Sequence, residues 1–347
     1  MSYSKYIEDL YRPLLEKTDR ASYTCLDKNE APFSAFDNNK NLITSEDIYN
    51  LKSYPNPFFL YEDLSSFLNI DIDNILLTQG SEQAIDFVFR VFLSEDDTVV
   101  FLEPSFAMFD VFAFQNKAKV KTIKFDENMT LNINKVLDSI TVDTKLFALA
   151  NPNNPTGTAF TEKELYAIAR HTKKINTIFL LDEAYFYYFS VNSLAFIKEF
   201  DNIIITRTFS KAFGLAGSRV GYAISNTKNI NLLRKVKPID ELNSLSIILA
   251  QKALLQADEI LNKNITQVEK WKEIFFNTPL DNMEYIKTEG NFILLKSFDF
   301  DKHKKIFLDN KILPKMGFPQ EYLKSCIRFS ITEDIIMFKI LDLLKDK

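Results

Sequence analysis

The chain has 347 residues, of which 46% are hydrophobic and 26% are charged. This composition is typical of a globular protein of about two domains and excludes a coiled coil, a collagen-like chain and wholesale disorder. The 42 Lys and Arg residues against 47 Asp and Glu residues give a net charge of -5, without a basic stripe. The charge disfavours nucleic acid and membrane as partners, so we expect a small-molecule ligand.

Cysteine and histidine are too scarce for the sites that these residues usually build. Cys25 and Cys326 are the only cysteines, and the two histidines, His171 and His303, lie among lysines. We therefore expect reduced cysteines, solvated histidines and no metal site. No stretch approaches 18 apolar residues, and the N-terminus lacks the apolar core of a signal peptide, so we expect a cytoplasmic protein.

Short β-rich apolar runs alternate with amphipathic segments between about residues 75 and 236. This alternation predicts a mostly parallel sheet that is covered on both faces. Helices are expected at 82–93 and 161–174, the second with a capping box of Thr161 and Glu164. Seven strands are predicted, at 75–79, 98–102, 120–125, 145–150, 177–182, 202–206 and 219–224.

The pattern changes after this region, to a long, charged, amphipathic stretch at 242–276. Apolar runs at 291–295 and 326–331 and a helix from residue 333 follow. A cleft between two closely packed domains is the expected ligand site. The predicted fold is α/β, with a large domain at 46–240 and a smaller α+β domain made of 1–45 and 241–347.

Polar residues follow the predicted strands, at the edge where open α/β sheets bind their ligands. Gly80, Ser81 and Glu82 join the first strand to a helix, where free N–H groups and the helix dipole favour a phosphate group. The turn-forming run from Asn151 to Gly157 holds a side-chain amide after the fourth strand. Either run alone could be a simple turn.

Two further strand ends carry ionisable residues. Asp182 ends a buried strand, where a carboxylate is costly unless it meets a cation, and Tyr185 lies three residues later. Lys211 follows the next strand, and its neighbours distinguish it from the other lysines. These neighbours are the hydroxyl residues Thr208 and Ser210, several small residues, and Arg219.

Together these groups suit one ligand, pyridoxal 5'-phosphate (PLP). It needs a lysine for its aldehyde, an acid for its ring nitrogen, and donors for its phenolic oxygen and its phosphate. The blocks N-P-x-N-P-T-G, D-E-A-Y and T-x-S-K-A-F-G-L-A-G-x-R resemble those of fold type I aminotransferases, the aspartate aminotransferase superfamily. Their order matches, with 28 residues from Asn154 to Asp182 and 29 from Asp182 to Lys211.

Further blocks resemble the histidinol-phosphate aminotransferase branch of this superfamily. Tyr54-Pro55 resembles its Tyr-Pro, which implies a homodimer, because that tyrosine reaches the cofactor phosphate of the neighbouring subunit. Asn29-Glu30 resembles its Asn-Glu, and Phe106 resembles its aromatic residue that stacks on the pyridine ring. The sequence departs from the branch near Lys315, where the family's arginine for the substrate phosphate is missing.

The resemblance implies the role of each site residue. Lys211 binds the cofactor aldehyde and moves a proton, Asp182 keeps the ring nitrogen protonated, and Asn154 and Tyr185 hold the phenolic oxygen. Arg328 grips the α-carboxylate of the amino donor. Asn29 and Lys315 are the further candidates for binding substrate. The implied ligands of the cofactor phosphate are Gly80, Ser81, the backbone of Glu82, Thr208, Ser210, Arg219 and Tyr54.

The sequence thus favours an aminotransferase that acts on a small phosphorylated amine or its carbonyl counterpart, with glutamate as amino donor. A three-carbon amino alcohol phosphate is the preferred example, because Lys315 supplies a point charge but not the bidentate fork of an arginine. The first alternative is a decarboxylase of a phosphorylated amino acid, which has the same core residues. The second is a non-catalytic cofactor-binding module, which the intact Lys211 and Asp182 disfavour.

Overall fold

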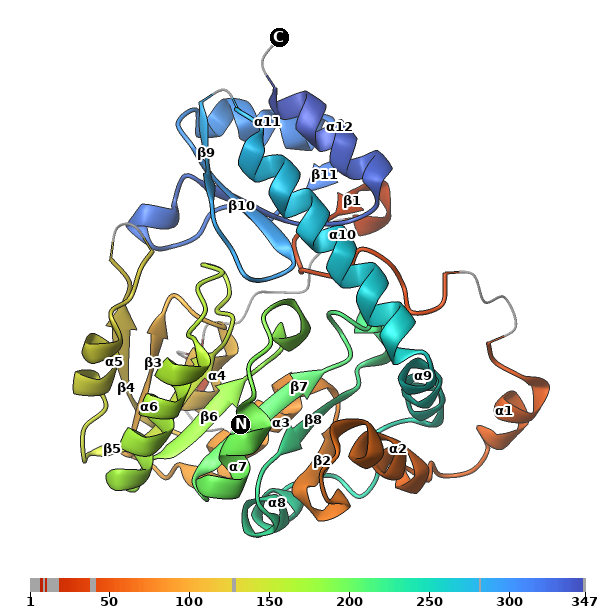
Figure 1. The fold of residues 1–347 in the computed structure, drawn as a ribbon, viewed down its shortest axis with the longest axis vertical. Coiled ribbons are helices and arrows are strands. Elements are labelled where there is room, and N and C mark those ends of the chain that lie inside the picture. Colours follow the sequence, from red (N-terminus) through yellow and green to blue (C-terminus); the bar gives the residue numbers. More distant parts are fainter. Residues whose placement is uncertain are drawn as a thin grey trace.

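The computed structural model describes residues 7–8, 10, 19–37, 42–126, 129–280 and 282–345. The predicted N-terminal part of the smaller domain, 1–45, therefore lies only partly within the described residues. A seven-stranded sheet with helices on both faces forms the lower part of the molecule in Figure 1. A three-stranded sheet and a pair of very short strands lie above it.

The large sheet has the strand order β2-β8-β7-β6-β5-β3-β4. Only β8 runs opposite to its neighbours, since it pairs antiparallel with both β2 and β7 while the other pairs are parallel. Each of the seven predicted strands is present, with ends shifted by one or two residues. They are β2 (Ile75–Thr78), β3 (Thr98–Glu103), β4 (Lys119–Lys124), β5 (Thr144–Ala150), β6 (Ile178–Asp182), β7 (Ile203–Thr208) and β8 (Gly221–Ile224).

The helices of the large sheet cover two separate hydrophobic clusters, one on each face. The apolar side chains along a strand alternate between the faces, so Leu180 of β6 joins one cluster while Phe179 and Leu181 join the other. Buried side chains from α3 (Gly80–Phe92), α4 (Met108–Gln115) and α8 (Thr227–Arg234) lie in the first cluster. Those from α2 (Phe58–Leu68), α5 (Ile133–Ser139), α6 (Glu162–Lys174), α7 (Phe196–Glu199) and α9 (Ser244–Leu255) lie in the second.

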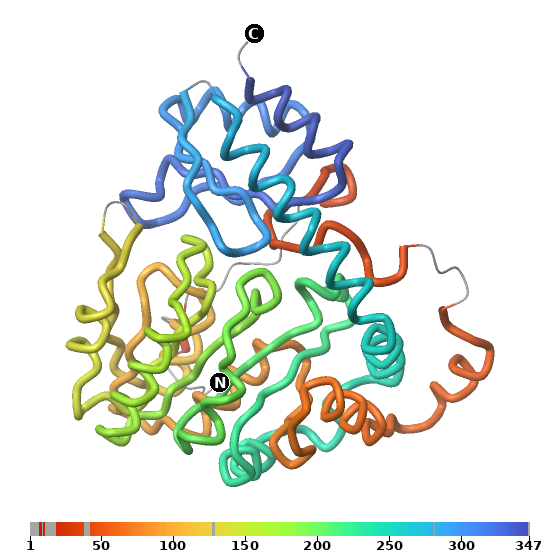
Figure 2. Tube along the Cα trace, viewed as in Figure 1, coloured from red at the N-terminus to blue at the C-terminus, as the bar shows by residue number. Residues whose placement is uncertain are grey.

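The smaller part of the fold is built around an antiparallel sheet of order β12-β10-β9. The segment that begins at residue 24 also belongs to this smaller part of the fold. Its strand β1 pairs in parallel with β11, which lies far along the chain (Figure 2). The strands are β1 (Thr24–Cys25), β9 (Met283–Ile286), β10 (Phe292–Ser297), β11 (Ile312–Leu313) and β12 (Cys326–Ser330). The remaining α-helices are α1 (Ser45–Asn50), α10 (Ala257–Asn277), α11 (Phe300–Asp309) and α12 (Asp334–Leu344). Short 3₁₀ turns lie at Arg20–Ser22, Ile72–Asn74, Phe186–Tyr188, Ser193–Ala195, Ala216–Ser218 and Glu321–Leu323.

The amphipathic stretch predicted at 242–276 forms two helices, α9 and α10, which meet at Gln256. The long helix α10 then runs from the large sheet to the small one (Figure 1). Its first buried residues, such as Ile260, belong to a cluster of the large sheet, whereas Val268, Trp271 and Phe275 pack in the cluster of the small sheet. The boundary at 240/241 stays a prediction; α9, which follows it, packs on the large sheet, and α10 connects the two parts.

The prediction that both histidines are solvated is wrong for His303. Its side chain is buried on α11, and its Nδ1 lies 2.8 Å from the hydroxyl of Ser297. The neighbouring lysines point outward because one face of a helix is covered, and His303 lies on the covered face with Phe307, four residues later. His171 is half-buried, with a ring nitrogen 2.8 Å from the carbonyl oxygen of Ile140.

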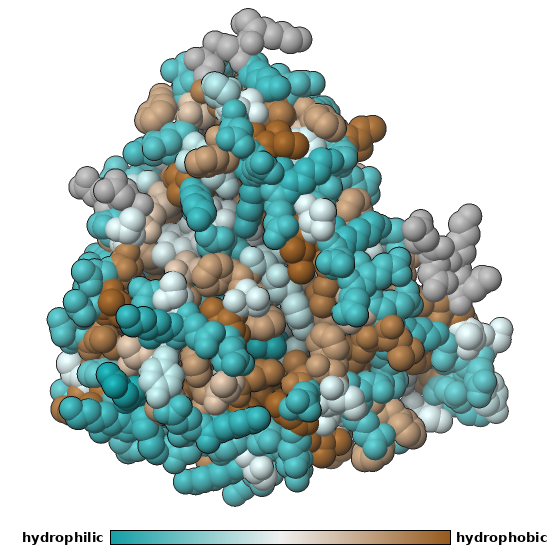
Figure 3. Space-filling view, viewed as in Figure 1, coloured by the Kyte–Doolittle hydropathy of each residue, from teal (hydrophilic) through white to brown (hydrophobic). Residues whose placement is uncertain are grey.

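Within the described residues, no helix has the length and apolar character needed to span a membrane. The face of the molecule drawn in Figure 3 is mostly hydrophilic, with hydrophobic side chains between the charged ones. The cytoplasmic location stays a prediction.

Candidate active site

A cavity of about 400 Å³ opens at the carboxyl edge of the parallel strands, between the two parts of the fold. Residues that follow β2, β5, β6 and β7 meet there with residues of β12 and of the segment after β1. Most of the predicted site residues line it. The lining residues are Asp27, Lys28, Ser81, Glu82, Phe106, Ala150, Asn154, Asp182, Ala184, Tyr185, Thr208, Ser210, Lys211, Arg219 and Arg328.

Asp182 lies at the end of β6, in the floor of this cavity. Its carboxylate is buried and accepts a hydrogen bond of 2.8 Å from the hydroxyl of Thr206. Burial raises the pKa of Asp182 to about 6, because a charge is poorly solvated there, and the neighbouring Glu183 adds to this. A cationic ligand atom above Asp182 would relieve this cost, as the sequence predicted.

Lys211 lies across the cavity, on the loop after β7. Its amine donates hydrogen bonds to the backbone carbonyls of Lys28, at 2.8 Å, and of Asn29, at 2.9 Å. Burial lowers the pKa of Lys211 to about 7, and the positive charge of Arg328 lowers it further. An amine that titrates near neutral pH can act both as a nucleophile and as a proton carrier.

Tyr185 is buried beside these groups, with its hydroxyl in the site. The side-chain amide of Asn29 donates a 2.8 Å hydrogen bond to this hydroxyl. The Tyr185 ring packs edge-on against Phe292, with the ring centroids 6.0 Å apart. Asn29 has a φ of 54°, a left-handed conformation that asparagine tolerates better than most residues. Two side chains therefore hold the phenol in one orientation.

Hydroxyl and guanidinium groups converge at the other end of the cavity. The hydroxyl of Thr208 lies 2.9 Å from that of Ser210, which also accepts a 3.2 Å hydrogen bond from Arg219. Gly80 begins α3 with a φ of 75°, and a Cβ atom there would lie 2.6 Å from Arg219 Nη2. Because Gly80 has no side chain, Arg219 lies close to the N-terminus of α3. Its guanidinium and the free N–H groups of that helix therefore face the same end of the cavity, which suits a phosphate.

Arg328 is a buried cation on β12. One Nη donates to the side-chain oxygen of Asn154, and the other donates to the carbonyl of Asp27 at 2.6 Å. No carboxylate of the described residues forms an ion pair with Arg328, and its Nε has no hydrogen-bond partner. A buried guanidinium without an anion is costly, so the site favours a ligand with an anionic group.

A second cavity, of about 670 Å³, adjoins the first and shares Asp27, Lys28, Phe106, Asn154 and Arg328 with it. Lys315 lies in its wall, paired with Arg328 across a short antiparallel bridge of 2.8 and 2.9 Å hydrogen bonds. Residues directly opposite in such a bridge place their side chains on the same face. The second cavity thus has two cations in one wall. Its other walls include Glu103, Asp110, Phe318 and Pro319.

Four predicted residues do not line the first cavity, and one of them, Lys315, lies in the wall of the second. Asn29 lies behind the first cavity and acts through Tyr185 and Lys211, while Gly80 acts through the space that it leaves for Arg219. Tyr54 is 88% exposed, outside both cavities. Its contribution to a neighbouring subunit stays a prediction.

Sequence reasoning assigned no role to Thr206, to Asn291 or to the backbone of residues 26 to 30. Thr206 lies on β7, directly opposite Asp182 in the sheet register, so the strand pairing could have indicated it. The carbonyls of Lys28 and Asn29 carry no side-chain signal. Their place next to the Asn-Glu block was the only pointer to them.

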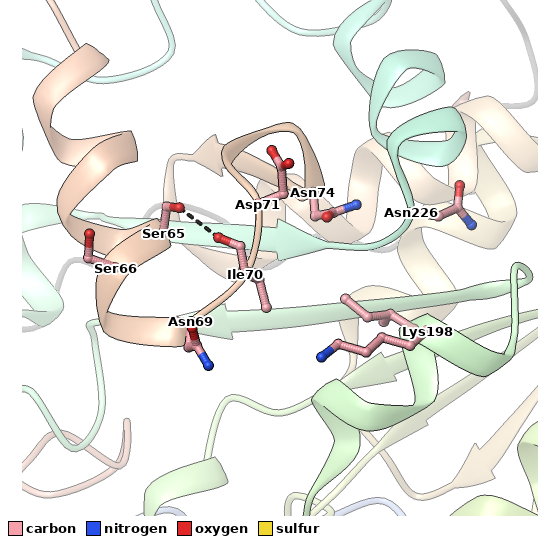
Figure 4. A pocket seen from close by; sticks show the side chains of 9 residues that line it. Ser65, Ser66, Asn69, Ile70, Asp71, Asn74, Lys198 and Asn226 are labelled. Carbon is pink, nitrogen blue, oxygen red and sulfur yellow. Dashed lines mark hydrogen bonds between the residues drawn. The ribbon is translucent and has the colours of Figure 1, made fainter.

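Another hollow, of about 670 Å³, lies at the opposite edge of the large sheet, where β2 begins and β8 ends (Figure 4). Polar side chains there bond to the backbone of the fold: the hydroxyl of Ser65 donates to the carbonyl of Ile70 at 2.6 Å, and the amide of Asn74 donates to the carbonyl of Ser225, just after β8, at 2.9 Å. It contains none of the predicted residues. We therefore place the active site at the carboxyl edge.

Comparisons with known proteins agree with this fold. The family described as "Aminotransferase class I and II" matches residues 23–332. Histidinol-phosphate aminotransferase of Methanocaldococcus jannaschii is 34% identical over 78% of this chain and 74% of its own length. The enzyme of that name from Clostridium novyi is 30% identical over 95% of this chain and 92% of its own. Histidinol-phosphate aminotransferase of Sinorhizobium meliloti, solved in complex with pyridoxal 5'-phosphate, has a TM-score of 0.83 at 20% identity, over 99% of this chain and 96% of that chain.

The fold and the site thus define an aminotransferase of fold type I. The chain belongs to the class I and II aminotransferase family, and its relatives include histidinol-phosphate aminotransferases. This membership confirms the enzyme class and the cofactor predicted from the sequence, a PLP-dependent aminotransferase. The individual site residues stay predictions.

Proposed function

We propose that the protein transfers an amino group between glutamate and a small phosphorylated ketone. The observation that carries this proposal is the pair of cations in the wall of the second cavity. Arg328 and Lys315 lie opposite each other there, next to the cavity that contains Lys211 and Asp182. Two separate cations suit a site that binds a carboxylate in one half-reaction and a phosphate in the other.

The residues of the first cavity fit the cofactor. Asp182 is a buried carboxylate that needs a cation, and a protonated pyridine nitrogen supplies one. We assign the phenolic oxygen to Asn154 and Tyr185, and one ring face to Phe106. We assign the cofactor phosphate to Ser81, the backbone of Glu82, Thr208, Ser210 and Arg219, with Gly80 leaving room for it.

When bound, PLP supplies an aldehyde for the substrate amine and a ring that accepts electrons. Lys211 removes and returns the proton at the substrate's α-carbon, and its lowered pKa of about 7 lets the amine do both near neutral pH. Asp182 keeps a proton on the ring nitrogen. Tyr185, held by Asn29, donates to the phenolic oxygen and fixes the tilt of the ring.

Arg328 and Lys315 select the substrates in this proposal. Arg328 has a planar fork without an acidic partner, which suits the α-carboxylate of glutamate. Lys315 is a point charge, which suits one oxygen of a phosphate group. Glu103 and Asp110 accept hydrogen bonds, so a free hydroxyl of the substrate can face them. A three-carbon amino alcohol phosphate has both a phosphate group and a free hydroxyl, so it is the preferred candidate substrate.

The test compares phosphorylated and unphosphorylated forms of three-carbon amino alcohols, with histidinol phosphate as a competitor. We expect the substrate phosphate to raise kcat/KM by roughly 10- to 150-fold, because it adds a charge-assisted contact of about 1.5–3 kcal/mol. Lys315→Ala should remove most of this difference and leave the glutamate half-reaction unchanged. Lys324→Ala is the control, since Lys324 pairs with Glu321 and lies outside both cavities.

Three outcomes would change the assignment. Equal efficiency with and without the phosphate refutes the phosphate requirement. Preference for histidinol phosphate over every three-carbon candidate refutes the small substrate. Carbon dioxide release from a phosphorylated amino acid, without formation of the pyridoxamine form, would make the protein a decarboxylase.

The proposed enzyme is a homodimer. Several large apolar side chains on and beside α1 and α2 are exposed, which is unusual for so short a stretch of a soluble monomer. They are Ile48, Tyr49, Leu51, Tyr54, Phe58 and Phe59. A second copy of the chain that covers these side chains would bring Tyr54 to the cofactor phosphate of the neighbouring subunit. Sedimentation of a stable, fully active monomer of 40.2 kDa would contradict this.

A further inference from the structure

Five successive backbone carbonyls, from Leu26 to Glu30, accept hydrogen bonds in and beside the candidate site; we call residues 26–30 the strap. The Leu26 carbonyl accepts from the backbone N–H and the hydroxyl of Ser330, at 2.8 and 3.0 Å, and that of Asp27 accepts from Arg328 at 2.6 Å. The strap thus runs along β12 before it reaches Lys211.

The second half of the strap lies between Lys211 and Asn291. The Lys211 amine donates to the carbonyls of Lys28 and Asn29, at 2.8 and 2.9 Å. From the other side, the amide of Asn291 donates to the carbonyls of Asn29, at 3.1 Å, and Glu30, at 2.9 Å. One carbonyl, that of Asn29, therefore accepts from both side chains.

Asn291 is itself rigidly placed. Its side chain is fully buried at the start of β10, and its backbone carbonyl accepts a 3.1 Å hydrogen bond from Ile331. Gly290 before it leaves no room for a side chain, because a Cβ atom there would lie 2.4 Å from the Phe292 ring. Asn29 has a φ of 54°, so its peptide stays in place only where its surroundings hold it.

From this geometry we propose that Asn291 is a positioning residue: it holds the strap through the carbonyls of Asn29 and Glu30, and so places the carbonyls of Lys28 and Asn29 that hold the Lys211 amine whenever it is not linked to the cofactor. The inference rests on the proposed role of Lys211. In each half-reaction the substrate amine replaces that of Lys211, and the freed amine must stay close to the reacting carbon. Two fixed acceptors keep it there and favour its ammonium form after it has taken a proton.

Other charges also act on this amine and must be considered in any titration of it. Arg328 and Arg219 disfavour the ammonium form, while Glu30 and Asp182 favour it, and the ring of Tyr185 lies 5.5 Å away. Replacing the uncharged Asn291 removes none of these charges, and among them only Glu30 is bonded to it, through its backbone carbonyl. A change in the pKa of Lys211 on replacement of Asn291 therefore reports on the strap carbonyls.

The experiment measures Lys211 in the cofactor-free protein, by acetylation with isotope-labelled acetic anhydride at a series of pH values. Mass spectrometry gives the pH midpoint of reactivity, with the exposed lysines as internal standards. Asn291→Leu, which keeps the volume, and Asn291→Ala should both lower the midpoint for Lys211 by about one pH unit, since the ammonium form loses fixed acceptors. An unchanged midpoint in either folded variant overturns the proposal.

Asn202→Ala is the matched control. Asn202 is also a buried asparagine that donates to a backbone carbonyl, that of Thr177 at 2.7 Å, but at the far edge of the sheet. General loss of stability should be similar in this variant, whereas the Lys211 midpoint should not move. A shift of the same size in Asn202→Ala would show that the effect is not specific to the strap.

A second measurement uses the wild-type enzyme, so it decides even where the variants fail to fold. In crystals grown with pyridoxamine 5'-phosphate, which cannot link to a lysine, Lys211 Nζ should lie within hydrogen-bond distance of the carbonyls of Lys28 and Asn29. An amine that points elsewhere refutes the proposal. Failure of the proposed role of Lys211 is recognised separately, because borohydride would then not fix the cofactor to Lys211.

Discussion

At the end of β6, Asp182 has a carboxyl group whose pKa burial raises to about 6. The uncharged hydroxyl of Thr206 donates a 2.8 Å hydrogen bond to it. In a protein without its cofactor, such a group costs stability when it is ionised, because the unfolded chain solvates the charge fully. In the proposed holoenzyme the same charge would hold the proton on the ring nitrogen. The same burial therefore weakens the cofactor-free fold and strengthens cofactor binding.

We expect Asp182→Asn to keep the fold and to lower kcat by about 10²- to 10⁴-fold, because a neutral amide cannot hold the ring proton. Asparagine can still accept the hydrogen bond from Thr206. Circular dichroism checks the fold, and steady-state kinetics with saturating PLP check the rate. Near-normal turnover would contradict the role of Asp182.

The same variant makes a prediction about pH. The pKa of Asp182 in the folded state, about 6, lies above the ordinary aspartate value of 3.8, so the folded state binds more protons between these two pH values. The stability of the cofactor-free wild type should therefore fall as the pH rises from about 4 to 6, relative to Asp182→Asn. At pH 7.5 the variant should be more stable by about 1–3 kcal/mol, and below pH 4 the two should be equal. Urea unfolding across this range measures the difference, and a constant difference would contradict the raised pKa.

Among the elements, α3 and the loop after β7 build the phosphate end of the site. Gly80 is the first residue of α3, and Arg219 approaches it so closely that a Cβ atom would overlap the guanidinium. We expect Gly80→Ala to displace Arg219 and to weaken PLP binding by about 10- to 100-fold, since a charge-assisted contact is lost. The control is Gly217→Ala, because Gly217 lies in the same loop as Arg219 and a Cβ atom there would have no other atom within 4 Å. Fluorescence titration of the two cofactor-free variants measures the affinities; equal affinities would contradict the assignment.

The elements also explain what could be predicted from the sequence. The central strands are buried on both faces, so β5 and β6 are continuous apolar runs, and the polar residues that follow each of them are easy to locate. Most of the candidate site could therefore be predicted, since it lies just after such strands. The strap could not, because backbone carbonyls act there and any residue has one. The burial of His303 was missed because three lysines around it dominate the local sequence. Burial depends instead on which face of α11 is covered, and His303 lies on that face.

At the scale of the whole molecule, α10 and the strap both connect the large sheet to the small one. The large sheet supplies Asp182 and Lys211, whereas β12 supplies Arg328. Since the strap bonds to Arg328 and to Lys211, a substrate anion at Arg328 would, in the proposed mechanism, act on the segment that also holds the Lys211 amine. Substrate binding and the position of Lys211 are thus connected through one short segment.

The proposed dimer extends this connection to a second chain and gives the last prediction. Lys211→Ala lacks the amine, and Tyr54→Ala lacks the side chain that we expect to reach the partner's cofactor phosphate. In a mixed dimer, one site combines both defects, while the other has Lys211 from one chain and Tyr54 from its partner. Random pairing makes half of the dimers mixed, so a co-expressed mixture should recover about a quarter of the wild-type activity at limiting PLP.

The two variants carry different affinity tags, so the mixed dimer can be isolated and its activity compared with that of each parent. The Tyr54→Ala parent should regain activity at high PLP concentration, because only a phosphate contact is missing, while Lys211→Ala should not. A mixed dimer no more active than the Tyr54→Ala parent would show that Tyr54 does not act across the interface. In that case the exposed apolar residues of α1 and α2 need another partner.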